Sequence, residues 1–535
     1  MCDIEIKMED EEALWKFLFL GGLVGVYRPG YRQIEDSDAD VIRRLIENGK
    51  HNKIIEYMCR ASRKCLKFYP IAYTLALCAR HAKKTVSQQA YAALPYVCRT
   101  PSHLFQFLSF CRTRFKCRGW PRTHRRAVAA WYTENEQYRK DPLKLAIHVT
   151  KYKRRYMFSQ KKVVKSCHPK PPNDAFRYIF RYVTNGVKKA NKARTNEKET
   201  QNVKGYITAV EFIKNKRKAE HEEEIKEVIQ KWRIPWENVP TSHLQSPEIW
   251  RALLRCNMPI IAMLRNLGRM GRLGILKPKS EEESIICERL KSVDSMESVH
   301  PIQILAAFAA YRRGQGLRAD SGHSWEVNKE IKQALIASYS LSEKNFEPTK
   351  RRILIAIDVK MNMEFHVLGI PSMSCKEAAV ALSLLFHNIF EVDTITFFKT
   401  AKPLQESPSG DPFDIDLYAN HSQYEEKETN YDVPFHYAKE HKFDTVLLLT
   451  DTLETMDIEK IRRSYKKTKQ PKSKCVVVSF KTSRPASVFG DSSMLDVVGV
   501  DEYAIEVIKE FIKDYKQEMV HITGGQSYER MEVDN

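Results

Sequence analysis

The chain has 535 residues, of which 43% are hydrophobic, and its formal net charge at pH 7 is +21. This length and composition predict a globular protein of two to four domains and exclude a disordered chain. Met1 to Glu12 is acidic and polar, and no run approaches the roughly eighteen apolar residues of a membrane span, so we expect a soluble cytoplasmic protein, with the nucleus as a second location.

The first part of the chain, to about Tyr339, has apolar residues at helical spacing and almost no strand-like alternation. Several helix starts are marked by Thr or Ser before Pro, as in Thr100-Pro101 and Ser246-Pro247, where the hydroxyl caps and the proline fits the first turn. This pattern predicts an all-α domain, either a degenerate helical-repeat solenoid or an irregular bundle.

Basic residues are concentrated in this first part. Residues 351–535 sum to −7, so with a total of +21 the first 350 residues carry +28, and residues 111–170 hold 18 Lys or Arg against three acids. Cations attract polyanions by counterion release, and interleaved aromatics such as Tyr152 and Tyr156 offer faces for unpaired bases. RNA is therefore the expected partner. Ordinary solvated helix faces are the alternative, and Trp120 and Trp131 fit a core better than a base platform.

The pattern changes at Pro348. Short apolar runs at 353–357, 394–398, 446–449 and 476–478 alternate with helical patterns, which predicts a doubly wound α/β sheet of parallel strands. The predicted domains are residues 1–345, α-helical, residues 346–520, α/β, and a disordered tail over 521–535. The twelve cysteines form no CxxC pair, so we expect free thiols.

Two aspartates, Asp358 and Asp451, follow predicted strands at the edge of the sheet where α/β proteins bind ligands. The segment from Asp358 to Asn362 resembles the Asp-x-Ser-x-Ser metal motif of von Willebrand factor type A domains, and Thr429 and Asp451 resemble its later ligands. Because Lys360 and Asn362 replace the serines, we expect no divalent metal and place the Lys360 ammonium between the aspartates. Alternatively, the aspartates are only strand-end carboxylates, or serve a nuclease or phosphotransferase, which would need a metal.

Both parts together resemble the large Ro ribonucleoprotein, or TROVE-domain, family from about Leu14 to Phe511. The most specific stretches are Thr241–Leu254, Met258–Met270, His300–Leu305 and Gly314–Arg318. The resemblance implies an α-helical ring of HEAT-like repeats followed by a doubly wound von Willebrand factor type A-like domain.

The resemblance also implies a function. It implies that small noncoding Y-type RNAs bind on a basic outer surface and single-stranded 3′ ends of misfolded RNAs in a central hole, in noncoding RNA stability or quality control. It implies no catalysis. We expect no cofactor, because Lys360 and Asn362 replace the serine ligands, and we expect a monomer. By position, the outer surface comprises Lys151, Lys153, Arg154, Lys162, Lys165, His168 and Lys170, and the hole Arg118, Arg122, Arg125 and Arg126. The alternative is a protein-interaction scaffold that uses the α/β domain, with RNA binding reduced or lost.

Overall fold

A computed structural model describes most of the chain. The described residues are 10–21, 26–27, 34, 37–64, 67–117, 119–152, 154–192, 196–216, 221–256, 258–297, 299–316, 323–343, 349, 351–404, 429–471, 473–483 and 493–512. The chain divides into two compact units. The sheet unit comprises Met1–Lys16, Gly22–Gln33 and Cys287–Asn535, and the helical unit comprises Phe17–Gly21 and Ile34–Ile286. The predicted tail from 521 lies outside the described residues.

The helical unit is built from short helices and one hairpin. Its helices are α2 Asp40–Glu47, α3 His51–Lys64, α4 Tyr69–Ala79, α5 Lys84–Val97, α6 Pro101–Thr113, α7 Arg122–Thr133, α8 Glu136–Lys140, α9 Pro142–Lys151, α10 Gln160–Cys167, α11 Asp174–Asn185, α12 Val187–Asn191, α13 Glu197–Asn215, α14 Glu222–Trp232, α15 Pro247–Arg255 and α16 Ile260–Arg272. Two helices, α1 Asp10–Leu20 and α17 Glu281–Lys291, cross the boundary between the units, and β2 Arg154–Arg155 pairs with β3 Phe158–Ser159.

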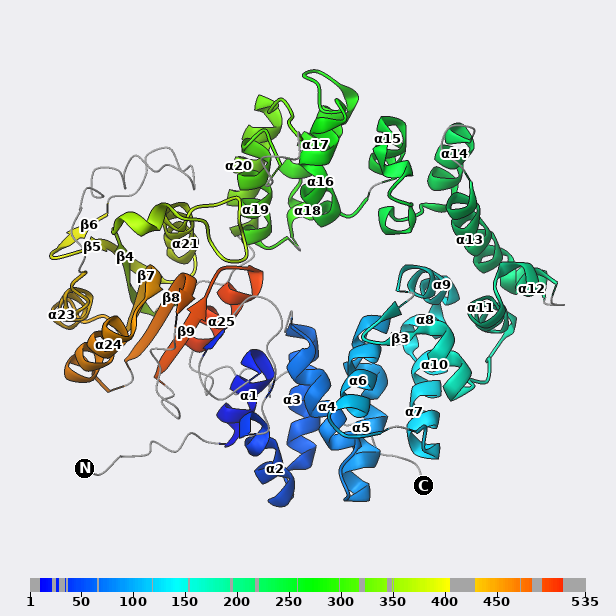
Figure 1. Ribbon diagram of the computed structural model, residues 1–535, viewed down its shortest axis with the longest axis horizontal. Coiled ribbons are helices and arrows are strands. Elements are labelled where there is room, and N and C mark those ends of the chain that lie inside the picture. Colours follow the sequence, from blue (N-terminus) through cyan, green and yellow to red (C-terminus); the bar gives the residue numbers. More distant parts are fainter. Residues whose placement is uncertain are drawn as a thin grey trace. The chain divides into compact units, whose positions relative to one another are not determined.

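Helices in this unit pack mainly on helices close to them in sequence (Figure 1). Helix α4 packs on α3, α5 and α6, and every residue of α4 is buried, as its apolar composition requires. Further along, α5 packs on α7, α7 on α10, α10 on α11, and α11 on α13. The hydroxyl of Thr100 accepts a hydrogen bond from the His103 amide and caps α6, as the Thr-Pro start predicted. Serial packing of this kind is typical of solenoids.

Three histidines, His124, which is buried, and His103 and His148, which are half-buried, make the helical unit sensitive to acid. Burial, with Arg80 nearby, lowers the pKa of His124 to about 4. Burial also lowers the pKa of His103 and of His148 to about 4, with help from Arg99 and from Lys151 and Lys144 respectively. The hydroxyls of Tyr91 and Tyr138 lie 3.1 Å and 2.8 Å from the Nδ1 atoms of His124 and His148.

We expect the free energy of unfolding to fall as the pH drops from about 6.5 to about 4. The folded-state pKa values lie below those of the unfolded chain, so unfolding takes up protons in this window, at about 1.4 kcal/mol per pH unit for each histidine. Urea midpoints at pH 7.5 and 5.5 measure the loss. Because carboxylates also titrate in acid, the control is His124→Gln, which should reduce the difference between the two midpoints; an unchanged difference would contradict the assignment to His124.

The sheet unit contains a seven-stranded sheet in the order β1-β9-β8-β7-β4-β5-β6 among the described residues. Its strands are β1 Val26–Tyr27, β4 Arg352–Asp358, β5 Glu391–Phe397, β6 Ala401–Pro403, β7 Thr445–Leu453, β8 Lys474–Ser483 and β9 Met494–Val498. Its helices are α18 Val293–Met296, α19 Pro301–Arg312, α20 Lys329–Glu343, α21 Cys375–His387, α23 Asp432–Glu440, α24 Thr455–Thr468 and α25 Glu502–Ile512, with the 3-10 helix η6 over Met361–Glu364.

The predicted doubly wound architecture is confirmed, with corrections at the sheet edges. Neighbouring strands are parallel except β5 and β6, which are antiparallel. Helices α23 and α24 cover one face, and α21 and α25 lie on the other (Figure 1). The prediction missed β6 and β9 and was wrong in making the first part entirely helical, because Val26–Tyr27 pairs with β9 and the β2–β3 hairpin lies among the helices. A strand of two residues is too short to show an alternating pattern in the sequence. It is identified only by the strand with which it pairs.

Helices α18 to α20 belong by their contacts to the sheet unit. The hydroxyl of Tyr339 donates to the carbonyl of Ala381 at 3.2 Å, and Gln303 Nε2 donates to Glu502 Oε1 at 3.3 Å. Their helical sequence pattern nevertheless continues that of the preceding residues. Among the residues that the structure describes, no helix has the length and apolar content needed to cross a lipid bilayer.

Candidate nucleic-acid interface

An open cleft of about 420 Å³ lies between α10 and α11 in the helical unit. Its lining combines the cations Lys165, Arg177 and Arg181 and the imidazole of His168 with the apolar residues Val164, Pro169, Pro171 and Phe180, and with Thr184. The three cations and His168 are exposed residues, whereas Val164 and Phe180 are buried. The cleft therefore presents positive charge above an apolar floor, which suits a phosphate beside a sugar or a base.

The turn after α10 fixes one wall of this cleft. His168 caps the helix in the left-handed conformation, with φ of +48°, and its amide donates to the Val164 carbonyl at 3.0 Å. A left-handed histidine is uncommon, because its Cβ crowds the backbone. Pro169 and Pro171 follow and restrict the chain further. This turn fixes the backbone from which the imidazole projects, which lowers the entropic cost of binding.

Arg177 and Arg181 were not among the predicted site residues. They lie four residues apart on α11 and so project from the same face of the helix. Arg177 forms an ion pair with Asp174 at 2.8 Å, whereas neither Lys165 nor Arg181 has an acidic partner among the described residues. The signal in the sequence was the alternation of these arginines with buried Phe176 and Phe180, which marks an amphipathic helix with a basic face.

The other residues predicted for the outer surface lie nearby in sequence but not in the cleft. Lys151, at the end of α9, pairs with Glu237 at 2.7 Å, and Lys162 lies 5.2 Å from the ring centroid of Phe158. Arg154 on β2 and Lys170 are exposed, and Lys153 lies outside the described residues. The hairpin turn carries an exposed aromatic, Tyr156, with φ of +46°. Arg154, Lys162 and Lys170 are therefore exposed cations, and Tyr156 offers an exposed aromatic face.

Three of the four arginines predicted for the hole lie among the described residues. Arg122, Arg125 and Arg126 are exposed on the first turns of α7, and Arg118 lies outside the described residues. Their neighbour His124 points inward and is 3% exposed. Trp131, on the same helix, is fully buried and Trp120 is half-buried, so Trp131 is a core residue as expected.

At the carboxyl ends of the strands, Asp358 lies at the centre of a polar cluster. Its Oδ2 accepts hydrogen bonds from the hydroxyls of Thr450 at 2.8 Å and Tyr431 at 3.3 Å. Its Oδ1 accepts from Thr429 Oγ1 at 3.3 Å and from the Lys360 amide at 3.2 Å. The Asp358 side chain is completely buried. A buried carboxylate needs such partners, because burial removes its hydration.

The side chain of Lys360 enters this cluster. Its Nζ lies 2.7 Å from Asp451 Oδ1 and 3.5 Å from Asp358 Oδ2, and it donates to the Thr452 carbonyl at 2.9 Å. Burial alone lowers the pKa of Lys360, but the two carboxylates together raise it, so the ammonium stays charged. Burial raises the pKa of Asp358, against the opposing effects of Lys360 and Thr450. Asn362 lies in η6 and is exposed.

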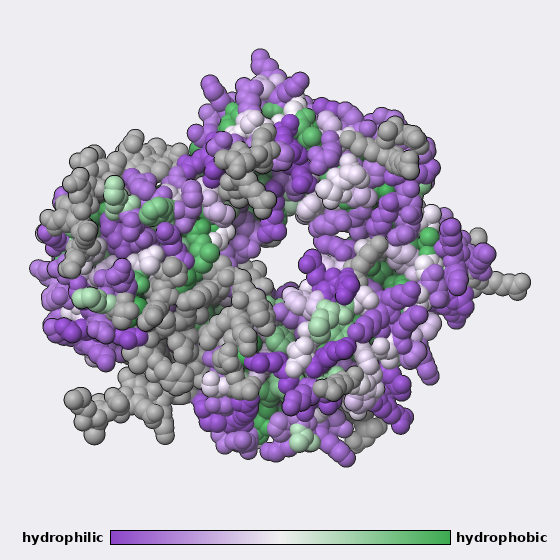
Figure 2. Space-filling view, viewed as in Figure 1, coloured by the Kyte–Doolittle hydropathy of each residue, from purple (hydrophilic) through white to green (hydrophobic). Residues whose placement is uncertain are grey.

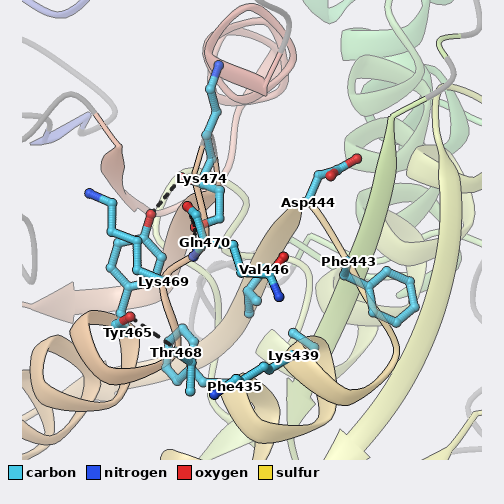
Figure 3. Close-up of a pocket in the computed structure, with 12 residues that line it drawn as sticks. Phe435, Lys439, Phe443, Asp444, Val446, Tyr465, Thr468, Lys469, Gln470 and Lys474 are labelled. Carbon is cyan, nitrogen blue, oxygen red and sulfur yellow. Dashed lines mark hydrogen bonds between the residues drawn. The ribbon is translucent and has the colours of Figure 1, made fainter.

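A second cavity, at the opposite ends of the strands, is too small for a substrate. It measures about 20 Å³ and lies among α23, α24 and the starts of β7 and β8 (Figure 3). Phe435, Val446 and Tyr465 line it, with Lys439 and Lys469 beside them. This volume holds about one water molecule, whereas ligand pockets measure some hundreds of Å³.

The surface supports a charged partner better than an apolar one. On the face shown in Figure 2, hydrophilic residues dominate the described surface, and hydrophobic residues form small separate groups. Extended apolar patches are the usual mark of protein or membrane contact. The exposed cations of the helical unit are therefore the main candidate site.

Comparisons with known proteins agree with this arrangement. The chain matches the TROVE domain model over residues 3–313 and the Ro60 vWA domain model over residues 352–512. "RNA-binding protein RO60" of Caenorhabditis elegans is 28% identical over 580 residues, covering 94% of this chain and 88% of the relative. The Deinococcus radiodurans protein of the same name is 29% identical over 409 residues, covering 75% and 72%. The crystal structure of the Deinococcus radiodurans RO (RSR) protein matches with a TM-score of 0.79 and 26% identity, covering 94% of this chain and 99% of that one.

Proposed function

The chain belongs to the TROVE-domain family, and from this premise we propose that it is an RNA-binding protein that acts by binding and not by catalysis. The observation that carries the proposal is the cleft between α10 and α11, where Lys165, His168, Arg177 and Arg181 surround an apolar floor. Cations at this density neutralise phosphates, and the floor accommodates sugars and bases.

The proposed main ligand is a small structured noncoding RNA of the Y type, bound on the outer basic surface. A duplex part of such an RNA is recognised through its backbone and shape, so several separate cations are needed along its path. The cleft, with Lys151, Arg154, Lys162 and Lys170, supplies them. Single-stranded 3′ ends of misfolded RNAs are proposed to bind at Arg122, Arg125 and Arg126, which the family resemblance assigns to the central hole. Together these sites support a role in noncoding RNA quality control.

We propose further that the protein is a monomer without a cofactor, located in the cytoplasm with the nucleus as a second location. The aspartates at the strand ends, Asp358 and Asp451, are engaged by Lys360, so their charge serves the ion pair. Catalysis of phosphoryl transfer by this pair would require metal-bound oxygens where the ammonium lies.

Recovery of RNA from the native protein tests the proposal. RNA crosslinked to the protein in its own cells is sequenced, beside RNA from cells expressing the variant that lacks the cleft cations. Discrete structured small RNAs that disappear in the variant support the proposal. Random RNA, or none, contradicts it and favours the alternative, in which the protein is a protein-interaction scaffold.

Salt dependence gives a quantitative prediction. If about six phosphates are neutralised, the affinity for a structured small RNA should fall by about 10³ between 50 and 200 mM salt, because each contact releases condensed counterions. Fluorescence anisotropy over this range measures the slope. An affinity that changes less than tenfold would contradict a phosphate-dominated interface.

A further inference from the structure

The residues at the carboxyl ends of the strands do not fit the divalent metal of the von Willebrand factor type A fold. The motif needs oxygen donors at positions 360 and 362, since Mg²⁺ takes six oxygen ligands in near-octahedral geometry. Position 360 supplies an ammonium, which carries only donor protons. Of the motif's two altered positions, Asn362 alone retains an oxygen, in its side-chain amide.

We propose that Lys360 is a tethered cation that permanently takes the place of the divalent metal in this domain. Four contacts locate it there. Its Nζ lies 2.7 Å from Asp451 Oδ1 and 3.5 Å from Asp358 Oδ2, the two carboxylates that match the motif. It also donates to the Thr452 carbonyl at 2.9 Å and to the Tyr431 hydroxyl at 3.5 Å. These partners resemble the oxygen shell that a metal would use, occupied by an ammonium.

Burial makes this replacement durable. The side chains of Asp358 and Asp451 are 0% and 2% exposed, and that of Lys360 is 19% exposed. Two carboxylates at such a depth require a neighbouring positive charge, because water does not compensate them. A metal ion entering from solvent would have to displace a covalently attached cation and would meet its repulsion at close range. We therefore expect the ammonium, and not Mg²⁺, to occupy this site at any ordinary Mg²⁺ concentration.

The other oxygen atoms that could bind a metal at this site already take part in hydrogen bonds with Asp358. The carboxylate of Asp358 accepts hydrogen bonds from Thr450, Thr429 and Tyr431 and from the backbone amide of Lys360. Thr429, which matches the distant threonine of the motif, thus directs its hydroxyl proton to Asp358. The Asp358 carboxylate is thus held by four hydrogen bonds and Asp451 by its ion pair with Lys360, so the fold of the sheet unit and any binding at this edge should be independent of divalent metals.

The first test uses the unaltered full-length protein. Thermal melting is followed in EDTA and in 5 mM MgCl₂, and isothermal titration with MnCl₂ and MgCl₂ probes binding directly. We expect melting temperatures that agree within about 1 °C and no saturable heat. Stoichiometric binding of either ion, or a fall of several degrees in EDTA, would overturn the proposal. Neither result depends on RNA, so the RNA-binding proposal stands or falls separately.

The second test removes the ammonium. Lys360→Ser should lower the melting temperature in EDTA by about 10 °C, because it leaves two buried carboxylates without their cation. Lys360→Ser combined with Asn362→Ser restores both hydroxyl ligands, and Mg²⁺ should then bind and recover most of the loss. The matched control is Lys376→Ser, which removes a buried lysine of the same unit that pairs with Glu364 at 3.2 Å, and Mg²⁺ should not rescue it. A single variant as stable as the original protein, or a double variant that binds no Mg²⁺, would contradict the assignment of Lys360 to a metal position.

Discussion

Replacing the three cations of the α10–α11 cleft and His168 by alanine is expected to lower the affinity for a structured small RNA by about 10²- to 10³-fold. The variant combines Lys165→Ala, His168→Ala, Arg177→Ala and Arg181→Ala. Each charge-assisted contact contributes about 1 kcal/mol after desolvation, and a tenfold change in affinity corresponds to about 1.4 kcal/mol. All four residues are exposed, so the fold should tolerate the changes.

The salt dependence of RNA binding by the same variant shows whether the loss of affinity comes from lost phosphate contacts. The slope of log affinity against log salt should become shallower by about one for each lysine or arginine removed that contacts a phosphate. Fluorescence anisotropy at several salt concentrations measures both quantities in one experiment.

A charge-matched control separates the cleft from the overall charge of the protein. It replaces three exposed lysines outside the cleft, Lys50, Lys231 and Lys277, by alanine, which matches the three formal charges lost with Lys165, Arg177 and Arg181. We expect this variant to bind with an affinity within a few-fold of the original, since distant charges are screened within about 8 Å at physiological salt. Equal losses in the two variants would show that binding depends on net charge and not on this cleft.

Replacing Trp131 by alanine is expected to reduce the free energy of unfolding by about 3–5 kcal/mol. The Trp131 side chain is fully buried on α7, and its indole N–H donates to the carbonyl of Cys98 at the end of α5. Its ring meets those of Tyr132 and Tyr138 edge-on, with centroids 4.9 Å and 5.5 Å apart. The substitution leaves a large cavity, removes two aromatic contacts and leaves a buried carbonyl without its donor.

Thermal and urea unfolding measure this effect, with Trp120→Ala as the control. Trp120 is half-buried and contacts His124 edge-on at 5.1 Å, so its removal should cost much less. The melting temperature of the Trp131 variant should fall by about 10 °C, and the protein that stays folded should keep its RNA affinity. A variant that melts normally but loses RNA binding would make Trp131 a base-stacking residue instead.

Sequence patterns predicted the two kinds of architecture because each depends on local periodicity. The apolar runs at 353–357 and 446–449 lie within strands β4 and β7, and the capped helix start at Thr100 lies where α6 begins. Strands buried on both faces and helices with one apolar stripe leave a mark in a few consecutive residues. The family resemblance rests on longer strings of the same kind, and the domain matches confirm it.

Tertiary structure alone decided which distant residues meet. No local pattern indicates that Val26–Tyr27 pairs with β9, or that Arg177 and Arg181 of α11 face Lys165 and His168 across one cleft. The sequence determined that Lys360 stands where a metal ligand is expected, because the motif around it is contiguous. Only the folded chain shows its ammonium 2.7 Å from Asp451, ninety-one positions away in sequence, because parallel strands bring their carboxyl ends to one edge of the sheet.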